Sequence, residues 1–321
     1  MITSYEEACR EWNGKPYHSL DFELKKIFGK KTYKIALESG CTCPNRDGTL
    51  GTRGCIFCSQ GGSGDFAIPR DGTVTSQITR GISFVSRKKE TGSSYIAYFQ
   101  SYSNTYAPAE QLEPVFLEAI HDPRICGLSI GTRPDCLESD ILSLLCRLNQ
   151  IKPVWVELGL QTIHEKTADW IRRGYPLRVF SDAVTALQKL HIPVIVHVIL
   201  GLPGETKEDM LNTIRYLSHM PVQGIKLQLL HILKHTDLEP LADTIPLLSR
   251  EDYIWQLQKS LELLPPDITI HRLTGDPPRS LLIAPAYSTD KRGILNQLHR
   301  TMKEQGSYQG KLYHTGKEDN L

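Results

Sequence analysis

Long hydrophobic segments are absent from this 321-residue sequence. The longest apolar stretch runs from Val194 to Leu202, is interrupted by His197, and is far too short to cross a bilayer. The first fifteen residues, MITSYEEACREWNGK, are acidic and contain no apolar core, so we expect no secretory signal. We therefore expect a cytoplasmic protein without a membrane partner, whose eight cysteines act as metal ligands or buried thiols and not as disulfides.

A strong net charge is also missing, as are internal repeats and low-complexity segments. The 37 Lys and Arg residues nearly balance 36 Asp and Glu residues, so the net charge of +1 indicates no polyanionic partner. Local basic density lies at Lys25, Lys26, Lys30, Lys31 and Lys34, and its default interpretation is a solvated surface. An apolar content of 40% is enough for the core of one large α/β barrel or of two smaller domains.

Short β-like runs alternate with helix-like stretches from residue 33 onward. The predicted strands are Tyr33–Glu38, Ser94–Gln100, Ile125–Arg133, Val154–Gln161, Val194–Leu200 and Ile225–Leu233. The segments between them have a helical period, as in Thr206–Met220, where Thr206 is the expected N-cap and Asp209 the third helical residue. Six successive β/α units predict a parallel sheet covered by helices.

One face of several predicted strands is polar. Side chains alternate across a strand, so residues of one parity share a face. The expected inner faces carry Gln100, Ser129, Arg133, Glu157, Gln161, His197, Lys226 and Gln228. A closed eight-stranded barrel fills its interior with apolar side chains instead. Because an unpaired buried polar group costs about 1–3 kcal/mol, the pattern predicts an incomplete, wider barrel with a ligand-filled lumen, some of these residues lying in water at strand ends.

Three cysteines follow the first predicted strand with the spacing Cys43-x11-Cys55-x2-Cys58. Three thiolates can hold three irons of an iron–sulfur cube and leave the fourth open to S-adenosylmethionine (SAM). Cys41 permits a second interpretation, a four-cysteine structural zinc site. The cluster is favoured because the loop is long, rich in turn residues and placed where a β/α barrel has its active site.

The other cysteines have simpler interpretations. Cys146 lies in a helical run and Cys126 on the apolar face of its strand, so both are expected to act as small hydrophobes. Cys136 lies near the predicted mouth of the barrel, where a bystander is favoured over a redox or substrate-contacting thiol.

Several motifs resemble those of a known family. CTCPNRDGTLGTRGCIFC, YFQSYSNTYAP, SIGTRPDC, WVELGLQT, VILGLPGET and HRLTGD occur in this order between residues 41 and 276, and SYQGK follows near the C-terminus. They are similar to motifs of the radical SAM family that contains the YhcC and MnmL (YtqA) proteins, and more distantly to the radical SAM core of the Elongator catalytic subunit.

The resemblance implies an α/β fold whose core is a partial (β/α)6 TIM-type barrel with a 4Fe-4S cluster on Cys43, Cys55 and Cys58. The eleven residues between Cys43 and Cys55 depart from the usual CxxxCxxC spacing, but the YhcC-like group shares this longer gap. By this comparison Cys41 is not one of the cluster ligands. The implied parts are an N-terminal extension (1–32), the radical SAM barrel (33–235) and a C-terminal α/β cap (236–321).

The same resemblance implies the residues that bind SAM. They are Gln100, with Tyr98 and Phe99, near the methionine amino group; Ser129, Arg133 and Asp135 at the carboxylate and ribose; Glu157 and Gln161 in the same cavity; and Gly201, with Leu202 and Pro203, near the adenine.

The implied reaction is reductive cleavage of SAM to a 5′-deoxyadenosyl radical that abstracts hydrogen from a substrate. For MnmL-like members the implied substrate is the tRNA wobble uridine, whose 5-carboxymethylaminomethyl side chain becomes 5-aminomethyl. The candidate catalytic residues, which would meet the substrate carboxylate or base, are His197, Lys226 and His231, with Lys234 beside them. The Lys25–Lys34 segment would contact tRNA phosphates, and a flavodoxin or ferredoxin would donate the electron.

Two alternatives stay open. A radical SAM enzyme acting on a small metabolite or peptide fits the near-neutral charge and the lack of a recognisable RNA-binding module. A zinc-stabilised binding protein without catalysis is the other alternative.

The C-terminal third is predicted to contain helices at Glu251–Leu264 and near Lys291–Lys303, and a β-like run at Ile268–Arg272. We expect it to close the open barrel as a cap. His271, Arg272 and Asp276 of the HRLTGD motif would either reach the cavity or stabilise a loop.

Overall fold

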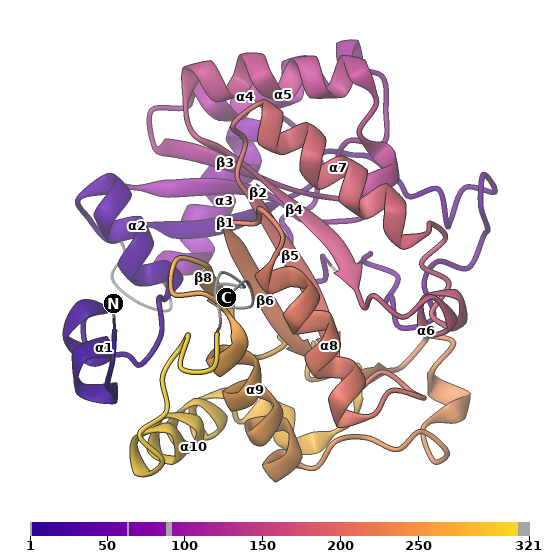
Figure 1. The fold of residues 1–321 in the computed structure, drawn as a ribbon. Coiled ribbons are helices and arrows are strands. Elements are labelled where there is room, and N and C mark those ends of the chain that lie inside the picture. The colour runs from indigo at the N-terminus through magenta and orange to yellow at the C-terminus, as the bar shows by residue number, and fades with distance from the viewer. Residues whose placement is uncertain (1, 63, 88–91, 314–321) are drawn as a thin grey trace, which may run out of the picture.

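A curled parallel sheet forms the centre of the fold (Figure 1). In the computed structural model, which describes residues 2–62, 64–87 and 92–313, seven strands lie in the order β1-β2-β3-β4-β5-β6-β8. They are β1 (Tyr33–Leu37), β2 (Tyr95–Phe99), β3 (Ile125–Thr132), β4 (Val154–Gln161), β5 (Val194–Leu200), β6 (Gly224–Leu229) and β8 (Thr269–Arg272). A separate antiparallel pair joins β7 (Ile232–Leu233) to β9 (Leu282–Ala284). The predicted α/β partial barrel is confirmed.

Helices connect the strands and cover the outer face of the sheet (Figure 1). They are α1 (Tyr5–Glu11), α2 (Leu20–Phe28), α3 (Val74–Ser86), α4 (Ala109–His121), α5 (Ser139–Ile151), α6 (Glu165–Trp170), α7 (Leu177–Lys189), α8 (Lys207–Ser218), α9 (Arg250–Leu263) and α10 (Lys291–Glu304), with 3-10 turns η1 (Pro134–Cys136), η2 (Glu239–Leu241) and η3 (Ala286–Thr289). Among the described residues, none of the helices combines the length and apolar character needed to cross a bilayer.

Local sequence signals set these elements as predicted. The Thr206 hydroxyl accepts a hydrogen bond from the Asp209 amide (3.1 Å), and the Asp209 carboxylate accepts one from the Thr206 amide (2.8 Å), so α8 begins with a capping box. On β4, Val156, Leu158 and Leu160 are fully buried in the main core, while the alternate residues face the lumen.

The C-terminal third contributes more to the barrel than the sequence predicts. The predicted sixth strand ends early, because the chain leaves β6 after Leu229 and pairs again only as β7. The run Ile268–Arg272, expected in a separate cap, forms β8 and pairs in parallel with β6, with Arg272 opposite Lys226. The sheet therefore has a seventh strand, and the HRLTGD motif begins inside the barrel.

Both ends of the described chain meet at the β8 edge. The amide of Ile270 donates to the His18 carbonyl (2.7 Å), which gives β8 a partner from the N-terminal extension. The side chain of Gln309 is fully buried there and accepts a hydrogen bond from the His18 amide (2.9 Å). It also donates to the carbonyls of Pro265 (2.7 Å) and Ile268 (2.8 Å). These bonds cover a strand edge that would otherwise stay unpaired.

Candidate active site

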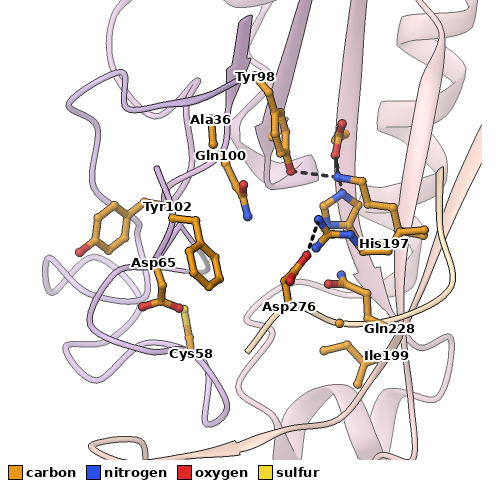
Figure 2. Close-up of a pocket in the computed structure, with 18 of the residues that line it drawn as sticks. Ala36, Cys58, Asp65, Tyr98, Gln100, Tyr102, His197, Ile199, Gln228 and Asp276 are labelled. Carbon is orange, nitrogen blue, oxygen red and sulfur yellow. Dashed lines mark hydrogen bonds and ion pairs between the residues drawn. The ribbon is translucent and has the colours of Figure 1, made fainter. Parts of the chain in front are cut away.

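A cavity of about 740 Å³ lies between the inner face of the half-barrel and the loop that follows β1. Its lining includes Cys43, Cys55 and Cys58 and all but one of the polar residues predicted to face inward. The exception, Ser129, donates to the lining residue Glu157 (2.6 Å). Figure 2 shows Cys58 on one side of this space and His197 on the other. The structure thus brings the predicted metal ligands and the polar strand faces to one site.

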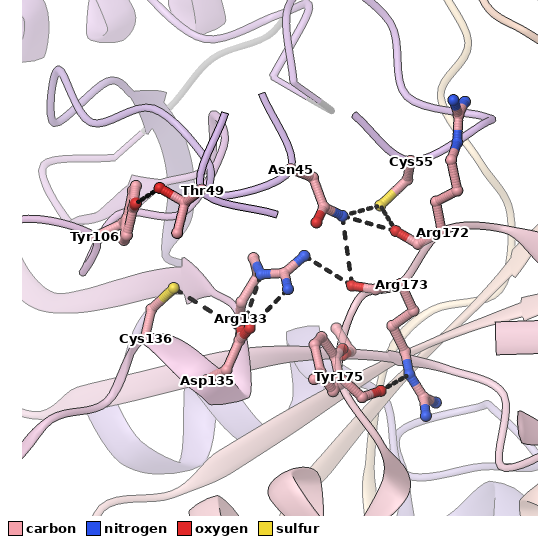
Figure 3. Close-up of polar contacts among 11 residues, drawn as sticks. Asn45, Thr49, Cys55, Tyr106, Arg133, Asp135, Cys136, Arg172, Arg173 and Tyr175 are labelled. Carbon is pink, nitrogen blue, oxygen red and sulfur yellow. Dashed lines mark hydrogen bonds and ion pairs between the residues drawn. The ribbon is translucent and has the colours of Figure 1, made fainter. Parts of the chain in front are cut away.

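The cysteine loop (residues 41–58) is held by hydrogen bonds to other segments. The Asn45 amide group donates to the Arg172 carbonyl (2.7 Å) and lies 3.4 Å from the Cys55 sulfur (Figure 3). The backbone amide of Ile56 donates to the carbonyl of Ile171 (3.2 Å). The turn after α6 therefore supports the middle of the loop.

Arg46 fixes the end of the same loop. Its guanidinium donates to the carbonyls of Cys58 (3.0 Å) and Ser59 (2.6 Å). Gly54 has a φ of +75°, and a Cβ there would lie 2.8 Å from Arg46 Nε. Glycine is required here because a side chain would both strain the backbone and displace the arginine.

The three cysteines of the predicted cluster site line one cavity. All eight cysteines are free of disulfides. Within the described residues, no three His, Cys, Asp or Glu side chains converge as ligands of one ion. A cube spreads three thiolates over three irons, whereas zinc needs four converging donors. Burial raises the pKa of Cys55 to about 12, aided by Cys58, so metal binding must displace its proton.

Cys41 and Cys136 lie outside this lining. Cys41 packs against the hydrophobic core, and burial raises the pKa of its thiol. Cys136 is buried 3.9 Å from an Asp135 carboxylate oxygen, and burial raises its pKa to about 12. Both thiols are therefore protonated at neutral pH, which makes them poor nucleophiles.

Arg133 and Asp135 form an ion pair at the cavity wall (Figure 3). The guanidinium donates two hydrogen bonds to the carboxylate (2.9 and 2.7 Å) and one to the Arg173 carbonyl (2.8 Å). It also lies over the Tyr175 ring, 5.0 Å from the centroid. In this structure both predicted SAM-contacting residues are engaged with protein groups.

A charged floor, formed by Lys34, Ser129, Glu157, His197 and Lys226, lies at the other end of the cavity. One Glu157 oxygen accepts hydrogen bonds from Lys34 (2.6 Å) and Ser129 (2.6 Å). The other accepts from His197 (2.7 Å) and Lys226. The Glu157 side chain has no solvent exposure, so these four donors replace its hydration.

Burial and neighbouring charges set the protonation of the floor. Burial alone would raise the pKa of Glu157, but Lys226 and Lys34 hold it well below the ordinary value. Burial lowers the pKa of Lys226 to about 7, against the attraction of Glu157. Burial and the charge of Lys226 lower the pKa of His197 to about 4. Glu157 is therefore ionised and His197 neutral at pH 7.

Comparison with known proteins gives the family. The Radical SAM superfamily pattern matches residues 47–217, and the Radical_SAM C-terminal domain matches residues 222–304. The chain is 41% identical over 308 residues to uncharacterized protein YtqA of Bacillus subtilis, covering 95% of both chains. It is 34% identical over 287 residues to protein YhcC of Escherichia coli K12, covering 88% of this chain and 91% of that protein. This chain belongs to the radical SAM superfamily.

Structural comparison gives the same radical SAM fold. The archaeal Methanocaldococcus infernus Elp3 with an N-terminal deletion superposes with a TM-score of 0.65 at 14% identity, over 87% of this chain and 64% of that chain. A shorter sequence match, 33% identical over 86 residues, links the chain to the tRNA uridine(34) acetyltransferase of Methanocaldococcus jannaschii and covers 26% of this chain and 15% of that protein.

The remaining predicted site residues of this radical SAM protein fall into two groups. Gln100, Gln161 and His231 line the cavity, and the buried Nε2 of His231 has no hydrogen-bond partner among the described residues. Gly201 is not part of the lining. Its amide donates to the Met210 sulfur (3.1 Å), and a Cβ at this position would lie 3.2 Å from the Leu248 side chain. The predicted adenine contact of Gly201 stays a prediction.

The basic segment before β1 differs from the tRNA-contact prediction at one residue. Lys34 points into the lumen, where it donates to Glu157 and Ser129, and its side chain is only 16% exposed. It is therefore unavailable to a phosphate on the surface. Lys25 pairs with Asp21 (2.8 Å) one helical turn away. Lys234, predicted to lie beside the candidate catalytic residues, is exposed and follows β7.

The HRLTGD motif reaches the cavity, as one of its two interpretations predicts. His271, Arg272 and Asp276 all belong to the lining, and Arg272 pairs with Asp276 (3.4 Å). The alternative of loop stabilisation also has support, because the same Asp276 carboxylate pairs with Lys291 at the start of α10.

Sequence reasoning missed two supporting residues. Arg173 is 2% exposed and donates to the carbonyls of Thr162 (2.6 Å) and Tyr175 (2.9 Å), which shapes the turn beneath the cysteine loop. Its neighbour Arg172 pairs with Asp237 at 2.6 Å. The only signal was the pair of arginines before Gly174, which looks like a surface cluster in sequence.

Proposed function

We propose that this radical SAM protein binds a 4Fe-4S cluster through Cys43, Cys55 and Cys58 and uses SAM to modify the wobble uridine of tRNA. The observation that carries the proposal is the placement of the three cysteine thiols on a cavity whose far end is a charged floor. When bound, the cluster and SAM supply a 5′-deoxyadenosyl radical for hydrogen abstraction.

The protein's own residues divide the remaining tasks. Asn45 and Arg46 order the loop that carries the thiols. Gln100 and Gln161 offer amide groups to the polar parts of SAM along the lining. Arg133 and Asp135 would exchange part of their mutual pairing for contacts with the SAM carboxylate and ribose. A flavodoxin or ferredoxin would deliver its electron near the cysteine loop.

The substrate assignment has two supports. One is the sequence match to a tRNA uridine(34) acetyltransferase, a protein named for action on the same nucleotide. The other is the cationic floor, which suits a side chain that ends in a carboxylate. In the proposed conversion, the carboxymethyl group of 5-carboxymethylaminomethyluridine leaves as glyoxylate. Water supplies the aldehyde oxygen, the side-chain nitrogen becomes the free amine, and the hydride equivalent removed ends in 5′-deoxyadenosine as SAM yields methionine.

The decisive experiment compares tRNA nucleosides from a deletion strain and its parent by mass spectrometry. We expect the deletion strain to accumulate 5-carboxymethylaminomethyluridine and to lack 5-aminomethyluridine. Anaerobically reconstituted protein should contain about four irons per chain and form 5′-deoxyadenosine when reduced with SAM and tRNA. Unchanged nucleosides in the deletion strain would refute the tRNA assignment.

A small metabolite or peptide is the second candidate substrate, and the net charge of +1 favours it. It predicts no tRNA retention on a filter at low ionic strength, where phosphate contacts are strongest. A zinc-stabilised binding protein is separated from both enzymes at purification, because it would be colourless with one zinc per chain.

A further inference from the structure

The charged floor has more basic than acidic side chains. Lys34 and Lys226 share the single carboxylate of Glu157, and the side chain of Lys226 is only 7% exposed. His197 donates to the same carboxylate. The Tyr98 hydroxyl accepts a hydrogen bond from Lys226 (3.1 Å), and burial raises the pKa of that phenol well above its ordinary value. None of the four groups that donate to Glu157 is acidic, so the two lysines of the floor share one carboxylate.

The neighbouring strand β8 does not correct this imbalance. Arg272 is paired with Asp276, which is also paired with Lys291, so this carboxylate already has two cationic partners. Burial holds the pKa of His271 well below its ordinary value, which leaves the imidazole neutral. Among the described residues that line this end of the cavity, the lysine and arginine side chains therefore outnumber the carboxylates.

A buried charge without a counterion is costly, and burial lowers the pKa of Lys226 to about 7 for this reason. An anionic ligand beside Lys226 would supply the missing counterion and favour the charged ammonium. Two imidazole nitrogens point to the same conclusion, because Nδ1 of His271 and Nε2 of His231 are buried, belong to lining residues and have no partner within the described ranges. A ligand would satisfy the lysine and offer these nitrogens hydrogen bonds.

The place of the floor favours an anion at the end of a side chain. The floor lies at one end of a cavity of about 740 Å³ whose other end carries the cysteines. A backbone phosphate of RNA could reach it only if the polynucleotide itself entered the barrel. A carboxylate at the tip of a base substituent can reach the floor while the phosphates stay outside.

We propose that the charged floor is the subsite for a substrate carboxylate, which Lys226 binds together with Lys34. The inference rests on the proposed function in one respect, since it takes this cavity as the substrate site. Binding there would hold the substrate by its anionic end and point the adjacent C–H bonds toward the cysteine side of the cavity. Lys226 is thus assigned as a specificity-determining residue.

The test uses cluster-reconstituted protein with SAM and without reductant, so that binding is measured without turnover. Equilibrium dialysis compares the nucleoside 5-carboxymethylaminomethyluridine with its methyl ester, which lacks the negative charge and carries one additional methyl group. We expect the acid to bind wild-type protein at least tenfold more tightly than the ester. Equal binding of the two nucleosides, or binding of neither, would overturn the subsite.

Variants then test whether Lys226 causes the tighter binding of the acid. Lys226→Met should reduce the ratio of acid to ester affinity to within twofold, while Lys226→Arg should keep most of it. Lys303→Met removes an exposed lysine of α10 and should leave the ratio unchanged, which controls for net charge. A Lys226→Met protein that folds and keeps the tenfold ratio would also overturn the assignment. The wild-type comparison stands even if that variant fails to fold.

The two proposals fail by different results. Unchanged tRNA nucleosides in the deletion strain would refute the tRNA function, whatever the dialysis shows. If wild-type protein binds the acid no more tightly than the ester, the carboxylate subsite is refuted, even if tRNA is the substrate.

Discussion

The cysteine loop and the charged floor bound the same cavity but are ordered in different ways. Apart from Lys34 on the edge strand β1, the floor side chains stand on strands paired on both sides, with Lys226 between His197 and Arg272. The thiols stand on irregular backbone, held by a few side chains such as Asn45 and Arg46. The sheet therefore preforms the electrostatics of the site, whereas the loop depends on local contacts and, under the proposed function, on the cluster that it would hold.

The largest expected effect is on the loop. Alanine at Cys43, Cys55 or Cys58 removes one of three iron ligands, so iron content should fall from about four per chain to near zero, and 5′-deoxyadenosine formation should stop. The fold should persist, because the strands do not depend on the loop. Cys146→Ala on α5 is the matched control and should keep its iron. A full iron complement in any of the three variants would exclude that cysteine as a ligand.

The next effect tests the floor. Glu157→Gln leaves two ammonium groups without their shared counterion and should lower the free energy of unfolding by about 3–5 kcal/mol, as measured by urea denaturation. Adding Lys226→Met should recover part of this loss, because it removes the surplus charge. Glu208→Gln breaks an exposed pair with Arg215 and should cost less than about 1 kcal/mol. Equal losses for Glu157→Gln and Glu208→Gln would contradict a buried charge network.

A smaller effect is expected where the loop meets its support. Asn45→Ala removes the amide donor of the Arg172 carbonyl, which keeps only the Cys55 thiol at 3.5 Å, and should lower the free energy of unfolding by about 1–3 kcal/mol. Reconstituted iron content should also decline, because Cys55 loses its neighbour. The control is Thr49→Ala. Thr49 lies in the same loop, and the substitution removes its exposed hydrogen bond to the Tyr106 hydroxyl. If both variants retain the same iron, Asn45 does not position the ligand.

The smallest effect is a pH dependence from the cavity wall. Burial lowers the pKa of His231 to about 4, below that of the unfolded chain, with a smaller contribution from Lys291. Below about pH 6.5 the unfolded state binds a proton that the folded state rejects, so stability falls as the pH decreases toward 4. Between pH 7 and 5, His231→Asn should lose about 1–2 kcal/mol less stability than wild type. If urea denaturation shows that both proteins lose the same stability between pH 7 and 5, His231 does not cause the pH dependence.

The sequence predicts the walls of the site well, because strand parity is a local property. The alternation in Val154–Gln161 places Glu157 and Gln161 inward, and the structure confirms both in the lining. The capping box at Thr206 is equally local. By contrast, Lys34 looks like part of a basic surface cluster until the pairing of β1 directs it into the lumen.

Long-range pairing could not be predicted in the same way. The run that becomes β8 carries no signal that it joins β6, since its partner lies more than forty residues earlier in the chain. The support of Cys55 by Arg172 likewise joins residues 117 positions apart. Such contacts follow from three-dimensional packing and not from a periodicity that a single sequence displays.

The hydrogen bond between His18 and Gln309 has a consequence for biosynthesis, because it spans 291 positions. During translation the β8 edge cannot be sealed until nearly the whole chain has left the ribosome. The nascent half-barrel therefore waits with an open strand edge, a state prone to mispairing. We expect metal loading of the cysteine loop, close to the N-terminus, to be possible well before this final closure.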